Sequence, residues 1–410
     1  MAVESWWSVP PLRRPAVRWP TGDVDGERPP GPWFLLSPDG AWVAATDRVS
    51  VRVTDPASGE LLWHDDVDWT GAPPAMVAAP DGSWLAVAAA GVTVYDPRTG
   101  AVIWSDPGVW IKDLVAAPTA AMLIGTVEDY DHGADIRVWD AATGEPRHSW
   151  YTTEGIHDGP DVAVSPDGSW AVTRCDTPGH YGGIWTYDMV SGNVRAMLDP
   201  GDHDPHMAVG GIAPDSSWLA LRGEVEGIVL VWHLAQGRTV AVVESAAESG
   251  GRVPGPPVHA ISSDSRWLVV GDEVSGVQVH DAATGHLVHR LAEAGAVTLV
   301  VTAPDATWLA TVDGGGVSVW DAATGRHIRR ITGGTAQAPP VIAAIGGTTD
   351  GGRLAIADAD ELTVWNPYAG QSTADDLPGR DQTGAPRQIH ELPGGRLAVV
   401  GEHGIHIVNS

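Results

Sequence analysis

The sequence contains very little of two residue types that often mark a protein's chemistry. Among 410 residues there is one cysteine, Cys175, and one lysine, Lys112. A single cysteine excludes an intrachain disulfide framework, and no basic cluster lies beside it to favour a reactive thiolate. The shortage of lysine, together with abundant alanine, glycine and proline, is typical of a protein from a GC-rich bacterial genome.

Long apolar runs are also missing. No window approaches the roughly 18 consecutive apolar residues that a membrane-spanning helix requires. The first residues, MAVESWWSVPPLRR, contain no unbroken apolar segment of the kind that a secretory signal has. We therefore expect a cytoplasmic protein that does not enter a membrane.

Motifs of the common catalytic and cofactor sites are absent as well. The chain has no G-x-x-x-x-G-K phosphate loop, no G-x-S-x-G nucleophile turn and no H-E-x-x-H zinc motif. We therefore predict no catalytic residues, no metal and no cofactor. An enzyme whose active-site residues come from scattered positions stays open as the alternative.

Acidic residues, in contrast, are in large excess. The formal net charge is −28 and the isoelectric point is near 4.7. Such a field repels phosphate backbones and anionic lipids, so we expect neither nucleic acid nor a membrane as partner. A protein partner with a basic surface fits this charge, and solubility alone is the alternative explanation. We expect a monomer.

A short turn motif recurs nine times and divides residues 33–410 into nine units. Its copies begin at positions 37, 79, 117, 165, 213, 262, 303, 348 and 392, and they read SPDGAW, APDGSW, APTAAM, SPDGSW, APDSSW, SSDSRW, APDATW, TTDGGRL and LPGGRL. Most units also contain a second turn, such as DPRTG at 96–100 or DAATG at 140–144. Proline, aspartate and glycine at these places predict tight turns, so each unit reads as four short strands.

The strand-like runs are apolar on both faces, as in WLAVAA from Trp84 and WLALRG from Trp218. A sheet covered on both faces has this pattern. Four-stranded sheets stacked face to face around an axis satisfy it. We therefore predict an all-β fold, a single closed β-propeller of nine four-stranded blades, with eight blades as the alternative.

Tryptophans recur at equivalent places in these units, and we expect them to pack between blades. They are Trp42, Trp84, Trp170, Trp218, Trp267 and Trp308 before the second strand, and Trp139, Trp185, Trp232, Trp320 and Trp365 at the end of the third.

The N-terminal segment, residues 1–32, precedes the first unit. The ninth unit ends after its third strand, so its outer strand must come from elsewhere or leave an edge open. PAVRWPTG at 15–22 has the length and character of the other outer strands. We predict that Ala16–Trp19 pairs beside Ile405–Val408 and closes the ring.

The repeat resembles that of the WD-repeat family. The family's strand-ending dipeptide is present in VWD at 138–140 and 319–321. The resemblance implies a β-propeller that serves as a non-catalytic platform for protein partners. Two departures stand out. The Gly-His that usually opens a family repeat is not evident. The Asp between second and third strands is plausible at Asp272 and Asp313 but absent from AVAAAGVTVY at 86–95, so the family's internal hydrogen-bond tetrad is mostly missing.

The first units also resemble quinoprotein propellers, because DPASGELLW at 55–63 and DPRTGAVIW at 96–104 place Asp, Gly and Trp as that family's docking motif does. The alternative function is accordingly a propeller enzyme, hydrolytic or quinone-dependent, with a metal or cofactor in the central channel.

The candidate binding surface is the end of the blades where connections vary in length. The first-to-second and third-to-fourth turns are short and uniform, whereas the other two connections vary, and variable loops on one face of a repeat array often bind partners. Acidic and histidine residues concentrate there in units three to five. They are Asp129, Asp131, His132, Asp135, His157, Asp158, His180, Tyr181, Asp202, His203, Asp204 and His206.

Three interpretations of these residues remain open. They could contact a basic partner, or they could be solvated polar loops of an acidic protein. A weak divalent-cation site is the third, because the carboxylates in DHDPH at 202–206 alternate along the chain.

Overall fold

The computed structural model describes most of the chain between residues 33 and 409. The described ranges are 33–46, 50–56, 58–67, 75–89, 91–108, 110–119, 121–129, 133–152, 162–177, 180–198, 207–223, 228–243, 258–272, 276–291, 297–332, 340–346, 352–358, 361–368, 372–376, 386–393, 395–401 and 405–409. These residues form strands and turns, with one short 3₁₀ helix, and they contain no helix with the length and hydropathy that a membrane span requires. The strands divide between two compact units, β1–β16 in one and β17–β35 in the other.

The first unit, called here the four-blade unit, contains four antiparallel sheets in which each strand pairs with its neighbours in sequence. Blade 1 consists of β1 (Trp33–Leu36), β2 (Val43–Thr46), β3 (Ser50–Thr54) and β4 (Leu61–Asp66). Blade 2 consists of β5 (Ala75–Ala78), β6 (Leu85–Ala89), β7 (Gly91–Tyr95) and β8 (Val102–Pro107). Blade 3 consists of β9 (Trp110–Ala116), β10 (Met122–Asp129), β11 (Gly133–Asp140) and β12 (Pro146–Thr152). Blade 4 consists of β13 (Val162–Val164), β14 (Trp170–Thr177), β15 (His180–Asp188) and β16 (Val194–Leu198).

The second unit, called here the five-blade unit, continues the same strand order. Blade 5 consists of β17 (Met207–Ile212), β18 (Trp218–Gly223), β19 (Val229–His233), the 3₁₀ helix η1 (Leu234–Gln236) and β20 (Arg238–Val243). Blade 6 consists of β21 (Val258–Ile261), β22 (Trp267–Asp272), β23 (Gly276–Asp281) and β24 (Leu287–Leu291). Blade 7 consists of β25 (Val297–Thr302), β26 (Trp308–Asp313), β27 (Gly316–Asp321) and β28 (His327–Ile331). Blade 8 consists of β29 (Val341–Ile345), β30 (Arg353–Ala357), β31 (Glu361–Trp365) and β32 (Ser372–Asp376). Blade 9 consists of β33 (Pro386–Leu392), β34 (Arg396–Gly401) and β35 (Ile405–Asn409).

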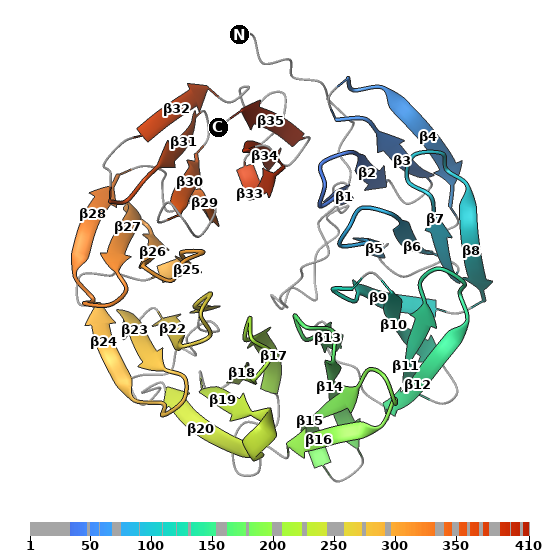
Figure 1. Ribbon diagram of the computed structural model, residues 1–410, viewed down its shortest axis with the longest axis horizontal. Coiled ribbons are helices and arrows are strands. Elements are labelled where there is room, and N and C mark those ends of the chain that lie inside the picture. The colour runs from blue at the N-terminus through green and yellow to red at the C-terminus, as the bar shows by residue number, and fades with distance from the viewer. Residues whose placement is uncertain are drawn as a thin grey trace, which may run out of the picture. The chain divides into compact units, whose positions relative to one another are not determined.

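The prediction of an all-β propeller with nine blades is therefore confirmed. Within each unit, the first strands of the blades lie on one side and the outermost strands on the other (Figure 1). In the described part of the chain, eight sheets have four strands and blade 9 has three. The predicted closing strand, Ala16–Trp19, lies outside the described residues.

The turn between the first two strands uses its own side chains, which explains why the same short motif recurs. Ser37 Oγ accepts hydrogen bonds from the backbone N–H groups of Ala41 and Trp42, at 2.9 and 3.0 Å. Ser165 and Ser262 accept the equivalent bonds in blades 4 and 6. In these three blades the turn therefore closes on itself through its own serine.

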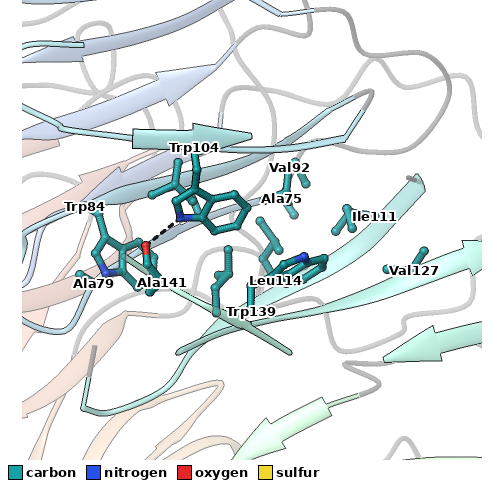
Figure 2. Close-up of a cluster of buried hydrophobic side chains, with 14 residues drawn as sticks. Ala75, Ala79, Trp84, Val92, Trp104, Ile111, Leu114, Val127, Trp139 and Ala141 are labelled. Atoms are coloured by element: carbon teal, nitrogen blue, oxygen red, sulfur yellow. Dashed lines mark hydrogen bonds between the residues drawn. The ribbon is translucent and has the colours of Figure 1, made fainter. Parts of the chain in front are cut away.

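The core lies between neighbouring sheets. One buried cluster joins Trp84 and Trp104 of blade 2 to Leu114 and Trp139 of blade 3 (Figure 2). Most of the recurring tryptophans take part in such clusters as predicted. Among the largest fully buried side chains are Trp42, Trp139, Trp170, Trp218, Trp232 and Trp308. Two others are only half-buried, Trp185 and Trp267.

A tryptophan on the fourth strand docks each of the first two blades onto the next. Trp63 Nε1 donates a hydrogen bond of 2.8 Å to the carbonyl oxygen of Pro97. Trp104 Nε1 donates one of 2.8 Å to the carbonyl oxygen of Ala141 (Figure 2). Both acceptors lie in the third-to-fourth-strand turn of the following blade, so the spacing of Asp, Gly and Trp in the sequence does encode contacts between blades.

The glycine that ends each of these turns leaves room for the docked ring. A Cβ on Gly100 would lie 2.8 Å from the Trp63 ring, and a Cβ on Gly144 would lie 2.6 Å from the Trp104 ring. Both glycines have positive φ angles, +73° and +74°. The position therefore requires glycine for two reasons, the backbone conformation and the close approach of the indole.

Other side chains take over this docking position in later blades. His148 Nε2 lies 3.2 Å from the carbonyl oxygen of Met189, and His289 Nε2 lies 2.9 Å from that of Ala323; in each contact the nitrogen is the donor. In blade 7 the same position is Arg329, whose guanidinium carbon lies 5.5 Å from the centre of a Trp ring in blade 8.

Candidate functional site

The two ends of the blades differ in chemistry. At one end, the third-to-fourth-strand turns are held by an aspartate that opens the turn. Asp140 Oδ1 accepts hydrogen bonds of 3.1 Å from the backbone N–H groups of both Ala142 and Thr143. Asp321 Oδ1 accepts bonds from the N–H and the hydroxyl of Thr324, at 2.9 and 2.7 Å. These carboxylates are already engaged by the turns that they form.

The same hydrogen bonds keep these carboxylates ionised. The bond from the Thr284 hydroxyl lowers the pKa of Asp281, and the bond from the Thr324 hydroxyl lowers the pKa of Asp321. In blade 3, the side chain of Arg147 lowers the pKa of Asp140. A carboxylate that is fixed in a turn in this way serves the fold, so we assign no binding role to these turn aspartates.

At the opposite end, the second-to-third-strand hairpins differ in length between blades. β10 and β11 have 8 residues each, and β14 and β15 have 8 and 9. The corresponding strands of blade 2, β6 and β7, have 5 each. At about 3.3 Å per residue, the hairpins of blades 3 and 4 extend roughly 10 Å further than that of blade 2.

Two of the predicted site residues, Asp129 and Asp135, lie on the long hairpin of blade 3. Asp129 is the last residue of β10 and pairs with Gly133. Asp135 follows in β11, is half-buried, and lies opposite Val127 on one side and Tyr151 on the other. The structure thus places both acidic residues at the protruding end of the sheet.

The long hairpin of blade 4 carries two further predicted residues, His180 and Tyr181. His180 begins β15 and lies opposite Thr177, the last residue of β14. Blades 3 and 4 contact each other through β12 and β14 and through β10 and β13. The backbone therefore brings His180 and Tyr181 to the same end of neighbouring sheets as Asp129 and Asp135.

The other predicted residues lie outside the described part of the chain, so the structure does not test them. They are Asp131, His132, His157, Asp158, Asp202, His203, Asp204 and His206. Within the described ranges, no group of three or more His, Cys, Asp or Glu residues is arranged to hold a metal ion. The cation interpretation of DHDPH concerns residues beyond those ranges.

In blade 7 an ion pair lies at the end of the second-to-third-strand hairpin. Asp313, the last residue of β26, is 8% exposed and accepts hydrogen bonds of 2.6 and 3.0 Å from Arg330. Arg330 also donates to Ser318 Oγ at 2.8 Å. The sequence singled out Asp313 by its place between two strands, and the structure shows that it anchors the fourth strand of its own blade.

Sequence reasoning missed a second surface, the outer edges of blades 1 and 2. Leu61 and Leu62 on β4, and Val102 and Ile103 on β8, are exposed. The runs LLW and VIW read like ordinary core strands. The docking motif is the one signal that could have distinguished these two runs from core strands. Its tryptophan turns toward the next blade, so the two residues before it lie at the rim.

Comparison with known proteins identifies the fold. No protein-family model matches the chain, and no curated protein is significantly similar to it. It is similar to a crystal structure of the eukaryotic initiation factor, with 13% identity and a TM-score of 0.58, over 84% of this chain and 88% of that chain. It is similar to the computationally designed Ika8 protein, with 17% identity and a TM-score of 0.52, over 82% of this chain and 95% of that chain.

Hydrazine synthase of Kuenenia stuttgartiensis is also similar, with 19% identity and a TM-score of 0.44, over 75% of this chain and 100% of that chain. That TM-score is too low to support an argument about this chain. The other two likenesses show the propeller fold alone, since one fold carries many functions.

Proposed function

We propose that the chain is a non-catalytic platform of the WD-repeat type, in the cytoplasm, that binds a protein partner at the ends of blades 3 and 4. The observation that carries this proposal is the length of the hairpins β10–β11 and β14–β15. These hairpins extend past that of blade 2, and they carry Asp129, Asp135, His180 and Tyr181. Binding residues are commonly held on such projections from a rigid scaffold.

The charge of the chain supports a basic partner. The formal net charge is −28, and the proposed contact residues are carboxylates, histidines and a tyrosine. Opposite charge on the partner would accelerate association and fix its orientation, and both effects would weaken as salt increases. The proposed surface also includes Asp202 and Asp204 in the connection between β16 and β17.

Affinity capture from the native cell, read by mass spectrometry, would identify the partner, and titration calorimetry would then measure the contact. We expect Asp129→Asn with Asp135→Asn to weaken binding, and Asp202→Asn with Asp204→Asn to weaken it further. Glu145→Gln, an exposed residue of a turn at the other end of blade 3, is the matched control. Affinity that is the same in all three variants would refute the proposal.

The alternative, a propeller enzyme with a metal or quinone in its channel, makes a different prediction. A bound ion or cofactor stabilises the folded state in proportion to its affinity. Thermal-shift measurements with calcium, zinc and pyrroloquinoline quinone therefore separate the two. A rise of many degrees with any of these ligands would favour the enzyme.

A further inference from the structure

The outermost strands of blades 1 and 2 are open edges. β4 ends its sheet and pairs with β3, and β8 ends the next sheet and pairs with β7. Among the described residues, no strand pairs with the outer side of either one. An edge strand presents a row of backbone N–H and C=O groups to which another strand can pair.

Two exposed apolar side chains begin each of these edges. Leu61 and Leu62 are 49% and 37% exposed, and Val102 and Ile103 are 55% and 42% exposed. The residue that follows each pair is the buried docking tryptophan, so the pairs themselves take no part in the hydrogen bond between blades. Consecutive apolar residues on an exposed edge favour association, and proteins usually avoid them.

Blade 3 has the same position in a protected form. Two residues after its turn glycine, at the place of Leu61 and Val102, β12 begins with Pro146 and continues with Arg147. Proline removes a backbone donor, and a charged side chain disfavours an apolar neighbour, so both protect an edge. The fold therefore tolerates proline and arginine at the start of an outer strand, and blades 1 and 2 have neither residue there.

Acidic residues accompany both open edges. Asp65 and Asp66 follow on β4, and Asp106 follows on β8. Two of these carboxylates are fixed at the rim by the next blade, since Tyr95 donates to Asp65 at 2.9 Å and Trp139 donates to Asp106 at 3.1 Å. An acidic edge on a chain of net charge −28 repels a second copy of the same chain and attracts a cationic segment.

The edge of blade 6 differs from these two edges in the sign of its charge. It also begins with two exposed apolar residues, Leu287 and Val288, which are 46% and 43% exposed. It continues with a histidine and an exposed Arg290, and β24 contains no acidic residue. An exposed apolar pair at the start is thus shared by these three edges, and of the three only β4 and β8 also carry acidic residues.

We propose that β4 and β8 are docking edges, each of which pairs with an extended segment of a partner protein that has apolar residues at one end and arginine or lysine at the other. Such a segment would extend the sheet through main-chain hydrogen bonds. Its apolar side chains cover the exposed pair at the start of the edge, and its cations face the aspartates at the end. This surface is distinct from the hairpin ends, and the proposal does not depend on the function proposed above.

The test uses the full chain and a fluorescein-labelled octapeptide of four valines followed by four arginines, with binding measured by fluorescence anisotropy. The variant copies the blade 3 sequence onto both edges: Leu61→Pro with Leu62→Arg, and Val102→Pro with Ile103→Arg. Because blade 3 folds with Pro and Arg at this position, the variant should keep its near-UV circular dichroism. We expect it to bind the peptide at least about tenfold more weakly than the unaltered chain.

The matched control closes the edge of blade 6 with Leu287→Pro and Val288→Arg, and it should leave the affinity unchanged. Absence of binding to the unaltered chain, equal affinity after both edges are closed, or an equal loss in the blade 6 control would overturn the proposal. A loss caused by Asp202→Asn with Asp204→Asn, and not by closing the edges, would place the peptide at the hairpin ends and also overturn it. The same holds if sedimentation shows a dimer that dissociates when the edges are closed, because a second copy would then be the occupant.

Discussion

Replacing Gly144 by alanine tests how blade 2 is docked onto blade 3. The φ angle of Gly144 is +74°, a conformation that costs a residue with a Cβ about 1–2 kcal/mol. The new Cβ would also lie 2.6 Å from the ring of Trp104. That ring cannot retreat without losing its hydrogen bond to Ala141 and its contact with Trp139. Overpacking of this kind adds about 1–3 kcal/mol, so we expect the free energy of unfolding to fall by about 2–5 kcal/mol.

Gly108 provides the matched control. Its φ angle is +81°, and a Cβ there would have no atom within 4 Å. Gly108→Ala should therefore cost the backbone term alone, about 1–2 kcal/mol. The difference between the two alanine variants measures the contact with Trp104.

A double-mutant cycle completes the measurement. Trp104 is 8% exposed, and Trp104→Ala should cost about 3–5 kcal/mol, because it opens a cavity and removes the partner of the Ala141 carbonyl. In that background Gly144→Ala should cost no more than Gly108→Ala, which gives a coupling of about 1–3 kcal/mol. Guanidinium unfolding followed by circular dichroism measures all five proteins. If Gly144→Ala costs the same with and without the indole, the docking argument is refuted.

Three further outcomes follow from the structure. Arg330→Ala removes the ion-pair partner of the buried Asp313. It should lower the free energy of unfolding by about 1–3 kcal/mol, a value reduced for solvent screening because Arg330 is a third exposed. A change below about 0.5 kcal/mol in urea unfolding would contradict this. The pKa values of Asp281 and Asp321 are lowered in the folded state. These carboxylates therefore stabilise the fold at pH values above the ordinary carboxyl pKa, and this stability is lost as pH falls below about 4. The melting temperature of the unaltered chain should therefore fall between about pH 4 and pH 2, and less steeply in Asp281→Asn with Asp321→Asn; parallel curves would contradict this. Deleting residues 1–22 should lower the melting temperature by many degrees, since Ala16–Trp19 is predicted to pair with β35, and a shift within error in differential scanning calorimetry would remove that prediction.

The fold could be predicted because its determinants are local. Ser37 closes the first-to-second-strand turn of blade 1, and Asp140 closes the third-to-fourth-strand turn of blade 3. Each of these hydrogen bonds joins residues within a few positions of each other. A sequence repeat of such turns gives the strand boundaries, and the boundaries give the blades. The docking of Trp63 and Trp104 was also encoded in the spacing of Asp, Gly and Trp.

The candidate site was only partly predictable for the opposite reason. The hairpin ends carry residues that occur once in the chain, so no repeat indicates how far each strand extends. Asp129 and His180 were assigned to loops, and the structure places both in strands, because β10 and β15 extend further than their counterparts in blade 2. The histidines that replace the docking tryptophan, His148 and His289, could not be separated from surface residues without knowing where the next blade's carbonyl lies.

On the outer strands, the residue that docks onto the next blade is distinct from the two residues that form the exposed edge. Four residues after the turn glycine, several blades carry a side chain that reaches the next blade, and this side chain is Trp104 in blade 2, His148 in blade 3 and Arg329 in blade 7. The two residues before it lie at the rim, where blade 3 has Pro146 and Arg147 and blade 2 has an exposed apolar pair. Because blade 3 still docks through His148 with its edge closed, docking does not require an open edge. The apolar pairs of blades 1 and 2 therefore have no explanation in the hydrogen bond between blades, and this is the reason to assign them to a partner.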